Sequence, residues 1–378
     1  MGIYFERRFN RGLLEIGIHE TIPYERNKTD VLAMINALQK NNELWELYTK
    51  SEEYTPLFLD QHKRFTYQFI KHRDVLRPMV SEFLVQNGLK IEYPEGKRFG
   101  VCLTHDFDFL YSPLLHNMWA IFKSITQLKV KNALNLALSN KMKKWSQLTK
   151  FESFMTLEEK YGAKSSFYLL APDKDAEDFS YPINNLENEL GNIVDRGWEV
   201  GLHVSREAYD SLGKIKEEKS RLERVLNKKL IGCRNHFLQF KVPNTWKLLS
   251  EACFKYDTTF GYADIVGFRN GMCHPFRPFD LDTNENINIL EIPLTVMDTS
   301  LFEKYMNFDV RNALDIIKLL IDSVRKYNGV ITILWHNTHL FGERLKLFER
   351  VLSYCQEKKA WITSGEEIYR FWSKNIDI

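Results

Sequence analysis

Short apolar segments alternate with helical segments along most of the chain, and this alternation limits the folds open to it. Eight mostly apolar, β-prone segments are expected to be strands, at residues 99–103, 165–170, 198–204, 230–236, 256–260, 289–297, 329–335 and 360–363. Helical segments separate most of them, at 151–161, 186–196, 209–226, 244–253, 310–327 and 343–358. Because strands joined through helices run parallel, seven or eight such units predict a (β/α) barrel rather than an open sheet.

Two regions fall outside this alternation. Residues 1–97 are expected to be a mainly helical N-terminal extension with no catalytic pattern of its own, while 98–378 form the barrel. Its helices are expected at 29–38, at 43–48 and, as one or two helices, throughout 65–87. Residues 109–150 contain seven lysines and no acidic residue, interleaved with Leu, Phe and Trp at helical spacing. This helical insertion is expected either to expose a solvated lysine face or to contact a membrane surface.

Composition narrows the class of protein. The formal net charge of +2 gives no argument for a nucleic-acid partner. The five cysteines are scattered without a C-x-x-C pair, which is typical of reduced thiols in the cytosol. The first residues are charged with no apolar run behind them, and no stretch of about 18 apolar residues occurs. We therefore expect a cytoplasmic protein, at most peripheral to the inner face of the membrane, and leave its oligomeric state open.

Ionisable residues gather where the expected strands end. They are Asp106 and Asp108 after the first strand, His203 after the third, Arg234 and His236 after the fourth, Asp264 and Arg269 after the fifth, and His336 after the seventh. In a parallel barrel these ends meet on one face, and barrels place catalysis there.

Two carboxylates two residues apart are costly in a dry site unless a cation or a role as a base compensates them. Taken alone, Asp106 and Asp108 could simply cap the following turn. The histidines at separate strand ends favour another interpretation, because an aspartate and two histidines suit zinc or a similar divalent ion with positions left for water and substrate. The sequence therefore predicts a divalent metal, zinc before others, that activates water and polarises a carbonyl group.

The strand ends carry four motifs, which read Thr104-His-Asp-Phe-Asp108, Glu199-Val-Gly-Leu-His-Val-Ser205, Arg234-Asn-His-Phe237 and Leu334-Trp-His-Asn337. Together they resemble the motifs of the polysaccharide deacetylase superfamily, also called carbohydrate esterase family 4. Residues 256–264 and 268–276 resemble hallmarks of a divergent bacterial surface-glycan branch. The resemblance covers about residues 99–372 and implies a distorted (β/α) barrel of seven or eight units.

The resemblance also implies roles. It implies Asp106 as the catalytic base, Arg234 as the residue that steadies it, and His336 as the general acid. A carboxylate near the His336 imidazole would favour its protonated form, and Asp264 or Asp298 is expected to supply it, with Asp264 counted among the catalytic residues.

Asp108 and His203 match metal ligands of the family, but the set departs from the usual pattern twice. Phe107 separates aspartates that are normally adjacent, although a spacing of two keeps both on one face of a strand. The usual second histidine is replaced by Glu207, so either Glu207 or His236 completes the site. We expect His236, because it lies at a strand end.

The long loop after the fifth strand contains Tyr262, Arg269 and His274 among aromatic residues. Loops of this length are often functional, so these three residues are expected to bind substrate, with Arg269 reaching a carboxylate or a phosphate. The alternative is a loop that packs on itself.

The expected function is a metal-dependent hydrolase that removes an N-acyl group, acetyl first, from an amino sugar of a glycan or glycan precursor such as a nucleotide-linked or lipid-linked sugar. One alternative is a glycosyltransferase-like protein that binds a sugar nucleotide through Asp106 and Asp108. Another is a non-catalytic carbohydrate-binding homologue. Phosphohydrolysis through His105 and Asp106 is less attractive, because such a pair needs a helical setting.

Overall fold

The central strand of the fold is β1 (Phe99–Phe107), which is buried along its whole length. The computed structural model describes residues 31–110, 143–303 and 305–375. In it, β1 pairs in parallel with β2 (Ser166–Leu170), β10 (Val330–Leu334) and β11 (Ala360–Thr363). A strand buried on both faces is encoded by a continuous apolar run, as residues 99–103 show. The strand continues four residues beyond that run, so Asp106 lies inside it.

The sheet extends from β2 through β3 (Glu199–Val204), β4 (Gly232–Asn235), β5 (Tyr256–Asp257) and β8 (Leu290–Glu291), and from β10 to β9 (Leu294–Met297). The expected strand at 289–297 is therefore two short strands, since Pro293 has no amide hydrogen to donate. One half of this segment pairs with β5 and the other with β10. It joins the two ends of the sheet, which makes the fold the distorted (β/α) barrel that the alternation predicts.

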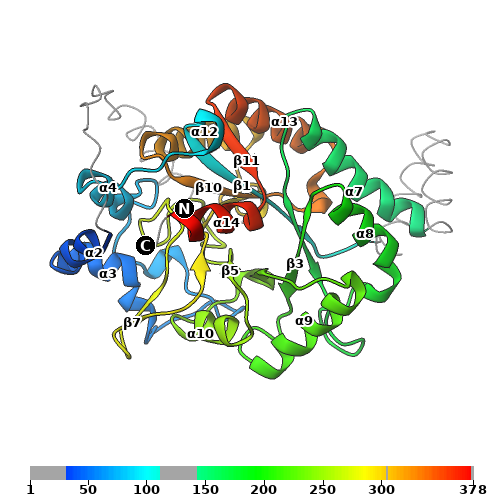
Figure 1. The fold of residues 1–378 in the computed structure, drawn as a ribbon, viewed down its shortest axis with the longest axis horizontal. Helices are drawn as coiled ribbons and strands as arrows, with labels where there is room; N and C mark the ends of the chain where they lie inside the picture. The colour runs from blue at the N-terminus through cyan, green and yellow to red at the C-terminus, as the bar shows by residue number, and fades with distance from the viewer. Residues whose placement is uncertain (1–30, 111–142, 304, 376–378) are drawn as a thin grey trace.

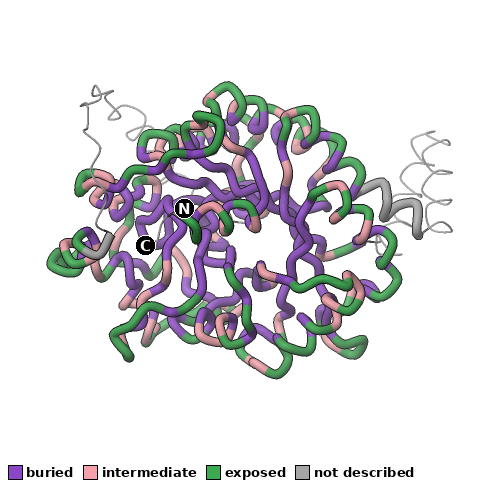
Figure 2. Tube along the Cα trace, viewed as in Figure 1, coloured by how far each residue is buried: buried purple, intermediate pink, exposed green. Residues whose placement is uncertain are grey.

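Helices surround the strands, and Figure 1 shows them as an outer ring. They are α7 (Lys143–Glu159), α8 (Glu187–Asp195), α9 (Leu212–Leu226), α10 (Asn244–Glu251), α11 (Asp298–Phe302), α12 (Val310–Lys326) and α13 (Gly342–Glu357). In α12, Asp309 caps the first turn through the amide of Asn312, and buried Ala313, Ile317 and Leu320 recur at helical spacing. Figure 2 shows the resulting contrast between buried strands and exposed outer helix faces.

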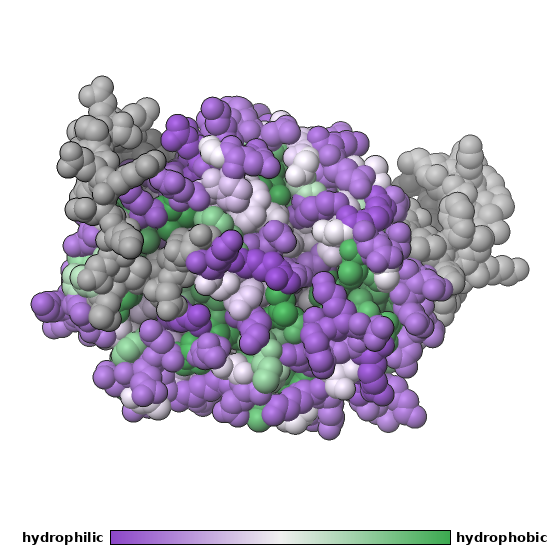
Figure 3. All heavy atoms as spheres, viewed as in Figure 1, coloured by the Kyte–Doolittle hydropathy of each residue, from purple (hydrophilic) through white to green (hydrophobic). Residues whose placement is uncertain are grey.

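The last helix, α14 (Gly365–Asn375), covers the N-terminal end of the barrel. Its first amides, from Gly365 and Glu366, donate to the side chains of Ser166 and Glu199 at the starts of β2 and β3. Figure 1 has this helix in front, and Figure 3 shows mainly hydrophilic side chains on the same side of the molecule. The carboxyl ends of the strands therefore lie at the opposite end of the barrel.

The N-terminal segment contains α2 (Val31–Gln39), α3 (Asn42–Thr49) and α4 (Met79–Gln86). The prediction of helices throughout 65–87 is wrong for 65–78, where only the single 3-10 turn Tyr67–Phe69 forms. Pro78 disfavours helical geometry in the residue before it, so α4 starts after the proline. Leu38, Leu47 and Val80 belong to the same hydrophobic core as the barrel strands, so this segment packs directly on the barrel.

The loop between β5 and β8 also contains the short hairpin of β6 (Phe279–Asp280) and β7 (Glu285–Asn286). Most of the expected lysine-rich insertion, residues 111–142, lies outside the described residues. Within the described ranges, none of the helices combines the length and the apolar composition needed to cross a bilayer.

A buried ion pair ties the N-terminal segment to the loop after β5. The guanidinium of Arg269 donates from Nε to Glu53 Oε1 at 3.1 Å and from Nη2 to Glu53 Oε2, and its Nη1 donates to the Gly261 carbonyl at 2.9 Å. The two charged side chains are only 2% and 3% exposed. Lys50 adds a second cation 3.6 Å from Glu53. Such a pair is costly to break, because the remaining partner stays buried without compensation.

We therefore expect Glu53→Ala to lower the free energy of unfolding by about 3–5 kcal/mol, because Arg269 would keep its charge in a dry environment. Urea unfolding followed by circular dichroism measures this change. Glu46→Ala is the matched control, since Glu46 pairs with Lys71 at the surface and should cost no more than about 1 kcal/mol. Equal effects of the two substitutions would contradict the proposed role of the buried pair.

Candidate metal centre and active site

The carboxyl ends of four strands bring five ionisable residues together. Asp106 and Asp108 lie at the end of β1 and just after it, His203 is near the end of β3, His236 follows β4, and His336 follows β10. All four strands run parallel, so their ends point the same way. The group therefore forms at the barrel face where the sequence predicts it.

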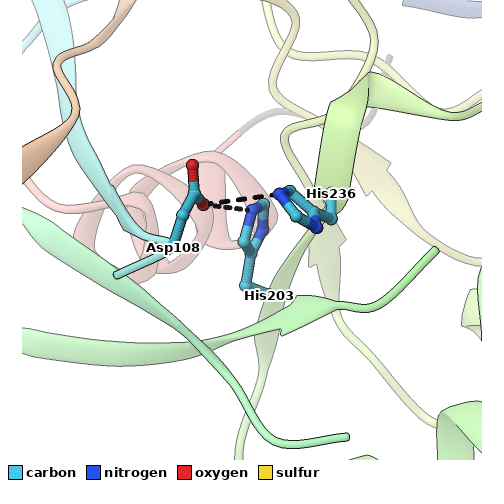
Figure 4. A group of neighbouring side chains, drawn as sticks. All are labelled: Asp108, His203 and His236. Atoms are coloured by element: carbon cyan, nitrogen blue, oxygen red, sulfur yellow. Dashed lines mark ion pairs between the residues drawn. The ribbon is translucent and has the colours of Figure 1, made fainter. Parts of the chain in front are cut away.

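Asp108, His203 and His236 form a group with the geometry of a metal site. One ligand atom from each lies within 4.8 Å of the others. Asp108 Oδ1 is 3.3 Å from His203 Nε2 and 3.7 Å from His236 Nε2, and Figure 4 shows both imidazole rings turned toward this carboxylate. In a tetrahedral zinc site with bonds of about 2.0–2.1 Å, neighbouring ligand atoms lie about 3.3 Å apart.

The bonding of Asp108 supports the same assignment. Its Oδ1 atom is buried and accepts no hydrogen bond of good geometry from the described residues. Burial raises the pKa of this carboxyl, but the facing histidines hold it well below its usual range. A buried carboxylate oxygen that faces two imidazole nitrogens fits a divalent cation, so the residues present suit the predicted ion.

Outer hydrogen bonds orient both imidazoles. His203 Nδ1 lies 3.0 Å from the Arg234 carbonyl, and His236 Nδ1 lies 2.8 Å from Asp178 Oδ2. A carbonyl and a carboxylate can only accept hydrogen bonds, so each Nδ1 carries the hydrogen. Each Nε2 is therefore free to bind a metal. Burial raises the pKa of Asp178, but its hydrogen bond with His236 holds it below the usual range. Sequence reasoning missed Asp178, which lies in a loop without a motif.

Asp106 is held beside this group by Arg234. The Arg234 Nη1 atom donates to Asp106 Oδ1 at 3.2 Å and to Thr104 Oγ1 at 2.8 Å, while Nε donates to the Thr258 carbonyl at 3.0 Å. The other carboxylate oxygen, Asp106 Oδ2, lies 3.7 Å from His203 Nε2. Asp106 and Asp108 thus approach the same imidazole, as their spacing of two on a strand predicts.

His336 shares a buried carboxylate with a second histidine. Its Nδ1 is 2.5 Å from Asp298 Oδ1 and its backbone amide donates to Asp298 Oδ2 at 2.8 Å, while His339 Nδ1 is 2.7 Å from the same Oδ2. Burial lowers the pKa of His336, but the charge of Asp298 and its hydrogen bond raise it to about 10. The imidazole is therefore a cation near neutrality, and its Nε2 lies 3.8 Å from Asp108 Oδ2.

The carboxylate beside His336 is Asp298 and not Asp264. Asp264 instead accepts hydrogen bonds from the backbone amide of Tyr67, at 3.1 and 3.3 Å from its two oxygens. Asp264 therefore anchors the N-terminal segment, and its place among the catalytic residues is not supported by these contacts. Asp298 directly follows β9. It would also directly follow the single strand expected at 289–297.

The three expected substrate-binding residues are buried and paired elsewhere. Arg269 is held by Glu53, and the Tyr262 hydroxyl accepts from Lys50 Nζ at 3.1 Å. His274 is enclosed between Ser81 Oγ at 2.8 Å and the Tyr327 carbonyl at 3.0 Å, and burial lowers its pKa to about 4. The expectation that this loop lines a sugar site is thus replaced by a packing role against the N-terminal segment.

Glu207 and His236 lie in different positions relative to the group around Asp108. Glu207 is exposed, pairs with Lys214 at 3.0 Å and accepts from the Glu177 amide at 3.0 Å. His236 instead belongs to the group around Asp108. The structure thus brings His236, and not Glu207, close to Asp108 and His203.

Comparison with known proteins adds a likeness in structure only. No protein-family model matches the sequence, and a search of curated proteins finds no match. A protein from Mycobacterium smegmatis to which polysaccharide deacetylase function is ascribed superposes with a TM-score of 0.52 at 14% identity, over 76% of this chain and 94% of that one. This likeness shows that the chain has the fold of a polysaccharide deacetylase.

Two further solved structures are similar at lower scores. A CE4 family pseudoenzyme from Bacillus anthracis gives a TM-score of 0.39 at 12% identity, over 73% of this chain and 66% of that one. A family 4 carbohydrate esterase from Streptomyces lividans, solved with acetate, gives 0.37 at 9% identity, over 70% and 91%.

Proposed function

We propose that this chain is a metal-dependent hydrolase that removes an N-acyl group, acetyl before others, from an amino sugar of a glycan or glycan precursor. The observation that carries the proposal is the Asp108, His203 and His236 group, flanked on one side by Asp106 held by Arg234 and on the other by His336 held by Asp298. A ligand set, a base and an acid on one barrel face are the parts that amide hydrolysis needs.

Asp108, His203 and His236 would hold the ion, with zinc as the first candidate from the donor set. A divalent ion in this position supplies Lewis acidity, which makes water more acidic and polarises the acyl carbonyl. The chain itself excludes bulk water from the ligands, since His203 is buried and Asp108 is mostly covered.

Asp106 is proposed to accept the proton of the attacking water. Its Oδ1 is engaged by Arg234, so Oδ2 is the oxygen left for proton transfer. Arg234 is itself fixed by Thr104 and Thr258, which keeps the carboxylate from turning away.

His336 is proposed to protonate the amine as the C–N bond breaks. Its Nδ1 is bound to Asp298, so Nε2 is the atom that faces the site and carries the transferable proton. Asp298 keeps the imidazole charged before the reaction and stabilises its orientation.

Two alternatives fit less well. A sugar-nucleotide site of the D-x-D kind would use both aspartates for a metal and diphosphate, whereas Asp106 is bonded to Arg234 and imidazoles surround Asp108. Phosphohydrolysis through His105 fails, because His105 is fully buried between the Trp335 carbonyl at 2.7 Å and Glu158 at 2.6 Å. A non-catalytic carbohydrate-binding homologue remains the competitor that an assay must eliminate.

All five cysteines are free, which supports a reducing compartment. We accordingly propose a cytoplasmic role in surface polysaccharide assembly, on a precursor rather than on the finished cell surface.

The deciding experiment incubates the purified protein with N-acetylated amino sugars and their short oligomers and measures released acetate. We expect release that a chelator stops and added zinc restores, and His203→Ala should fail to retain metal in elemental analysis. Metal-loaded protein that binds these sugars without releasing acetate would instead establish the carbohydrate-binding alternative.

A further inference from the structure

His105 is a buried histidine next to the proposed base, and the proposed chemistry does not use it. Asp106 faces the barrel interior, where it meets Arg234, whereas His105 points out toward the helices, because neighbouring residues of a strand face opposite sides. Its ring packs against Phe154 of α7, with centroids 3.9 Å apart, and against Phe348 of α13, with centroids 5.7 Å apart. An apolar ring would fill this space, so the polar side chain calls for an explanation.

The partner that orients this ring is Glu158 of α7. His105 Nε2 lies 2.6 Å from Glu158 Oε1, and the other carboxylate oxygen accepts from Ser165 Oγ at 2.8 Å and from Trp198 Nε1 at 2.6 Å. The side chains of His105 and Glu158 are both fully buried. A buried ionisable pair is costly, and complete hydrogen bonding fixes its side chains in one orientation. Glu158 therefore holds the His105 ring in place.

The other ring nitrogen of His105 holds the carbonyl that precedes His336. His105 Nδ1 lies 2.7 Å from the Trp335 oxygen, and a carbonyl can only accept, so Nδ1 carries the hydrogen of this bond. Because β10 ends at Leu334, this carbonyl lies just past the regular strand. The His105 side chain thus extends the contact between β1 and β10 as far as the residue before the proposed general acid.

The peptide group between Trp335 and His336 is consequently held from two directions. Its carbonyl accepts from His105, and its N–H, which belongs to His336, donates to Asp298 Oδ2 at 2.8 Å. Because a peptide group is planar, these two bonds fix its plane and, with it, the start of the His336 side chain. Asp298 also holds the imidazole itself, with Oδ1 2.5 Å from Nδ1. The direction of His336 Nε2 toward Asp108 therefore depends on both supports.

From this geometry we propose that His105, oriented by Glu158, is a positioning residue for the general acid His336. The inference rests on the proposed function, which assigns His336 its role, and it adds a residue that lies outside the site. Without the donor at Nδ1, the Trp335 carbonyl is buried without a partner, and the cost of such a group favours turning the peptide plane toward another donor. The imidazole then approaches the leaving amine at a changed angle, and a displacement of about 1 Å can cost about 10²-fold in rate.

Two substitutions at position 105 separate positioning from stability. His105→Asn has its amide nitrogen at the δ position and keeps a donor for the Trp335 carbonyl, but it leaves Glu158 Oε1 without its partner. His105→Gln has its amide nitrogen at the ε position and keeps a donor for Glu158, but it leaves the carbonyl without its partner. Losing the partner of a buried charge costs more than losing that of a carbonyl, so His105→Asn should melt at the lower temperature.

The turnover of an N-acetylated amino sugar should show the opposite order. We expect His105→Gln to lower kcat about 10- to 10²-fold with KM within about 2-fold of wild type, whereas the kcat of His105→Asn should stay within a few-fold. Both variants should retain zinc in elemental analysis. A purely structural role would make kcat follow the melting temperature, so a kcat of His105→Gln at or above that of His105→Asn overturns the inference.

His274→Gln is the matched control. His274 is also a fully buried histidine bonded through both ring nitrogens, but its bonds go to Ser81 and to the Tyr327 carbonyl rather than to the end of β10. Its kcat should stay within a few-fold of wild type. Should His105→Asn fail to fold, His105→Asn/Glu158→Gln replaces it, because this pair removes the unpaired charge and keeps the donor for the carbonyl.

Nuclear magnetic resonance of ¹⁵N-histidine-labelled protein separates this inference from the proposed function. The His336 signal, assigned by its absence in His336→Gln, should move by more than its linewidth in His105→Gln and stay near the wild-type position in His105→Asn. If the zinc-loaded wild type releases no acetate, the hydrolase proposal falls, and this pattern still establishes that His105 positions His336. If acetate is released but both variants keep the wild-type kcat and signal, the hydrolase stands and the inference is overturned.

Discussion

Asp106→Asn is expected to lower kcat about 10²- to 10⁴-fold, the range of one general base in a hydrolytic step. The amide keeps the size of the carboxylate but cannot accept a proton from water. Because Asp108, His203 and His236 are unchanged, the variant should still bind metal. Steady-state kinetics on an N-acetylated oligomer and elemental analysis of the same preparation measure the two effects.

Asp264→Asn is the matched control for this substitution. Asp264 is also a largely buried aspartate, but its oxygens accept hydrogen bonds from the Tyr67 amide rather than facing the metal group. We expect its kcat to stay within a few-fold of wild type. A loss in Asp264→Asn as large as that in Asp106→Asn, or near-normal turnover of Asp106→Asn, would refute the assignment of the base.

The sequence predicts the site better than its surroundings because strand ends are a local signal. Asp108, His203, His236 and His336 each follow an apolar run, and parallel strands must bring such positions to one face. The choice of His236 over Glu207 used the same argument. Asp178 gave no comparable signal, since its role depends on a loop that folds back to the His236 ring.

Arg269 illustrates why the loop after β5 was harder to interpret. A polar, aromatic-flanked loop is typical of a binding site, but a charge can equally be satisfied by a partner distant in sequence. That partner is Glu53, 216 residues away, and nothing in the local pattern identifies it. The role of the N-terminal segment was open for the same reason, because its contacts with Phe237 and Asp264 are all long-range.

The two short strands at 290–291 and 294–297 show how a proline limits the prediction of strands from apolar character. Residues 289–297 have the apolar character of one strand, yet they divide at Pro293 and serve two different neighbours. This division positions Asp298 at the end of β9, where it reaches both His336 and His339. The sequence offered Asp264 or Asp298 for this role and counted only Asp264 among the catalytic residues, whereas the closure of the barrel brings Asp298 to His336.

Asp298→Asn is expected to make turnover fall as the pH rises through about 6–7. In the wild type, burial lowers the pKa of His336 but the Asp298 charge raises it to about 10, so the proton donor is present throughout the neutral range. Without that charge the largest raising contribution is lost and only the smaller ones of Asp108 and Asp106 oppose burial, so the pKa should fall back toward its ordinary value of about 6.5. Above that pH the imidazole loses its proton, and kcat should drop about 10-fold per pH unit, reaching about 10²-fold at pH 8.5.

The pH–rate profile of kcat checks this, with the alkaline limb as the readout. His339→Gln is the control, because it removes the second imidazole on Asp298 but keeps the carboxylate bonded to His336. Its alkaline limb should stay near that of the wild type, whereas the limb of Asp298→Asn should move down by several pH units. If the two profiles coincide, His336 does not depend on Asp298 for its charge, and the donor of the leaving-group proton has to be sought elsewhere on this face of the barrel.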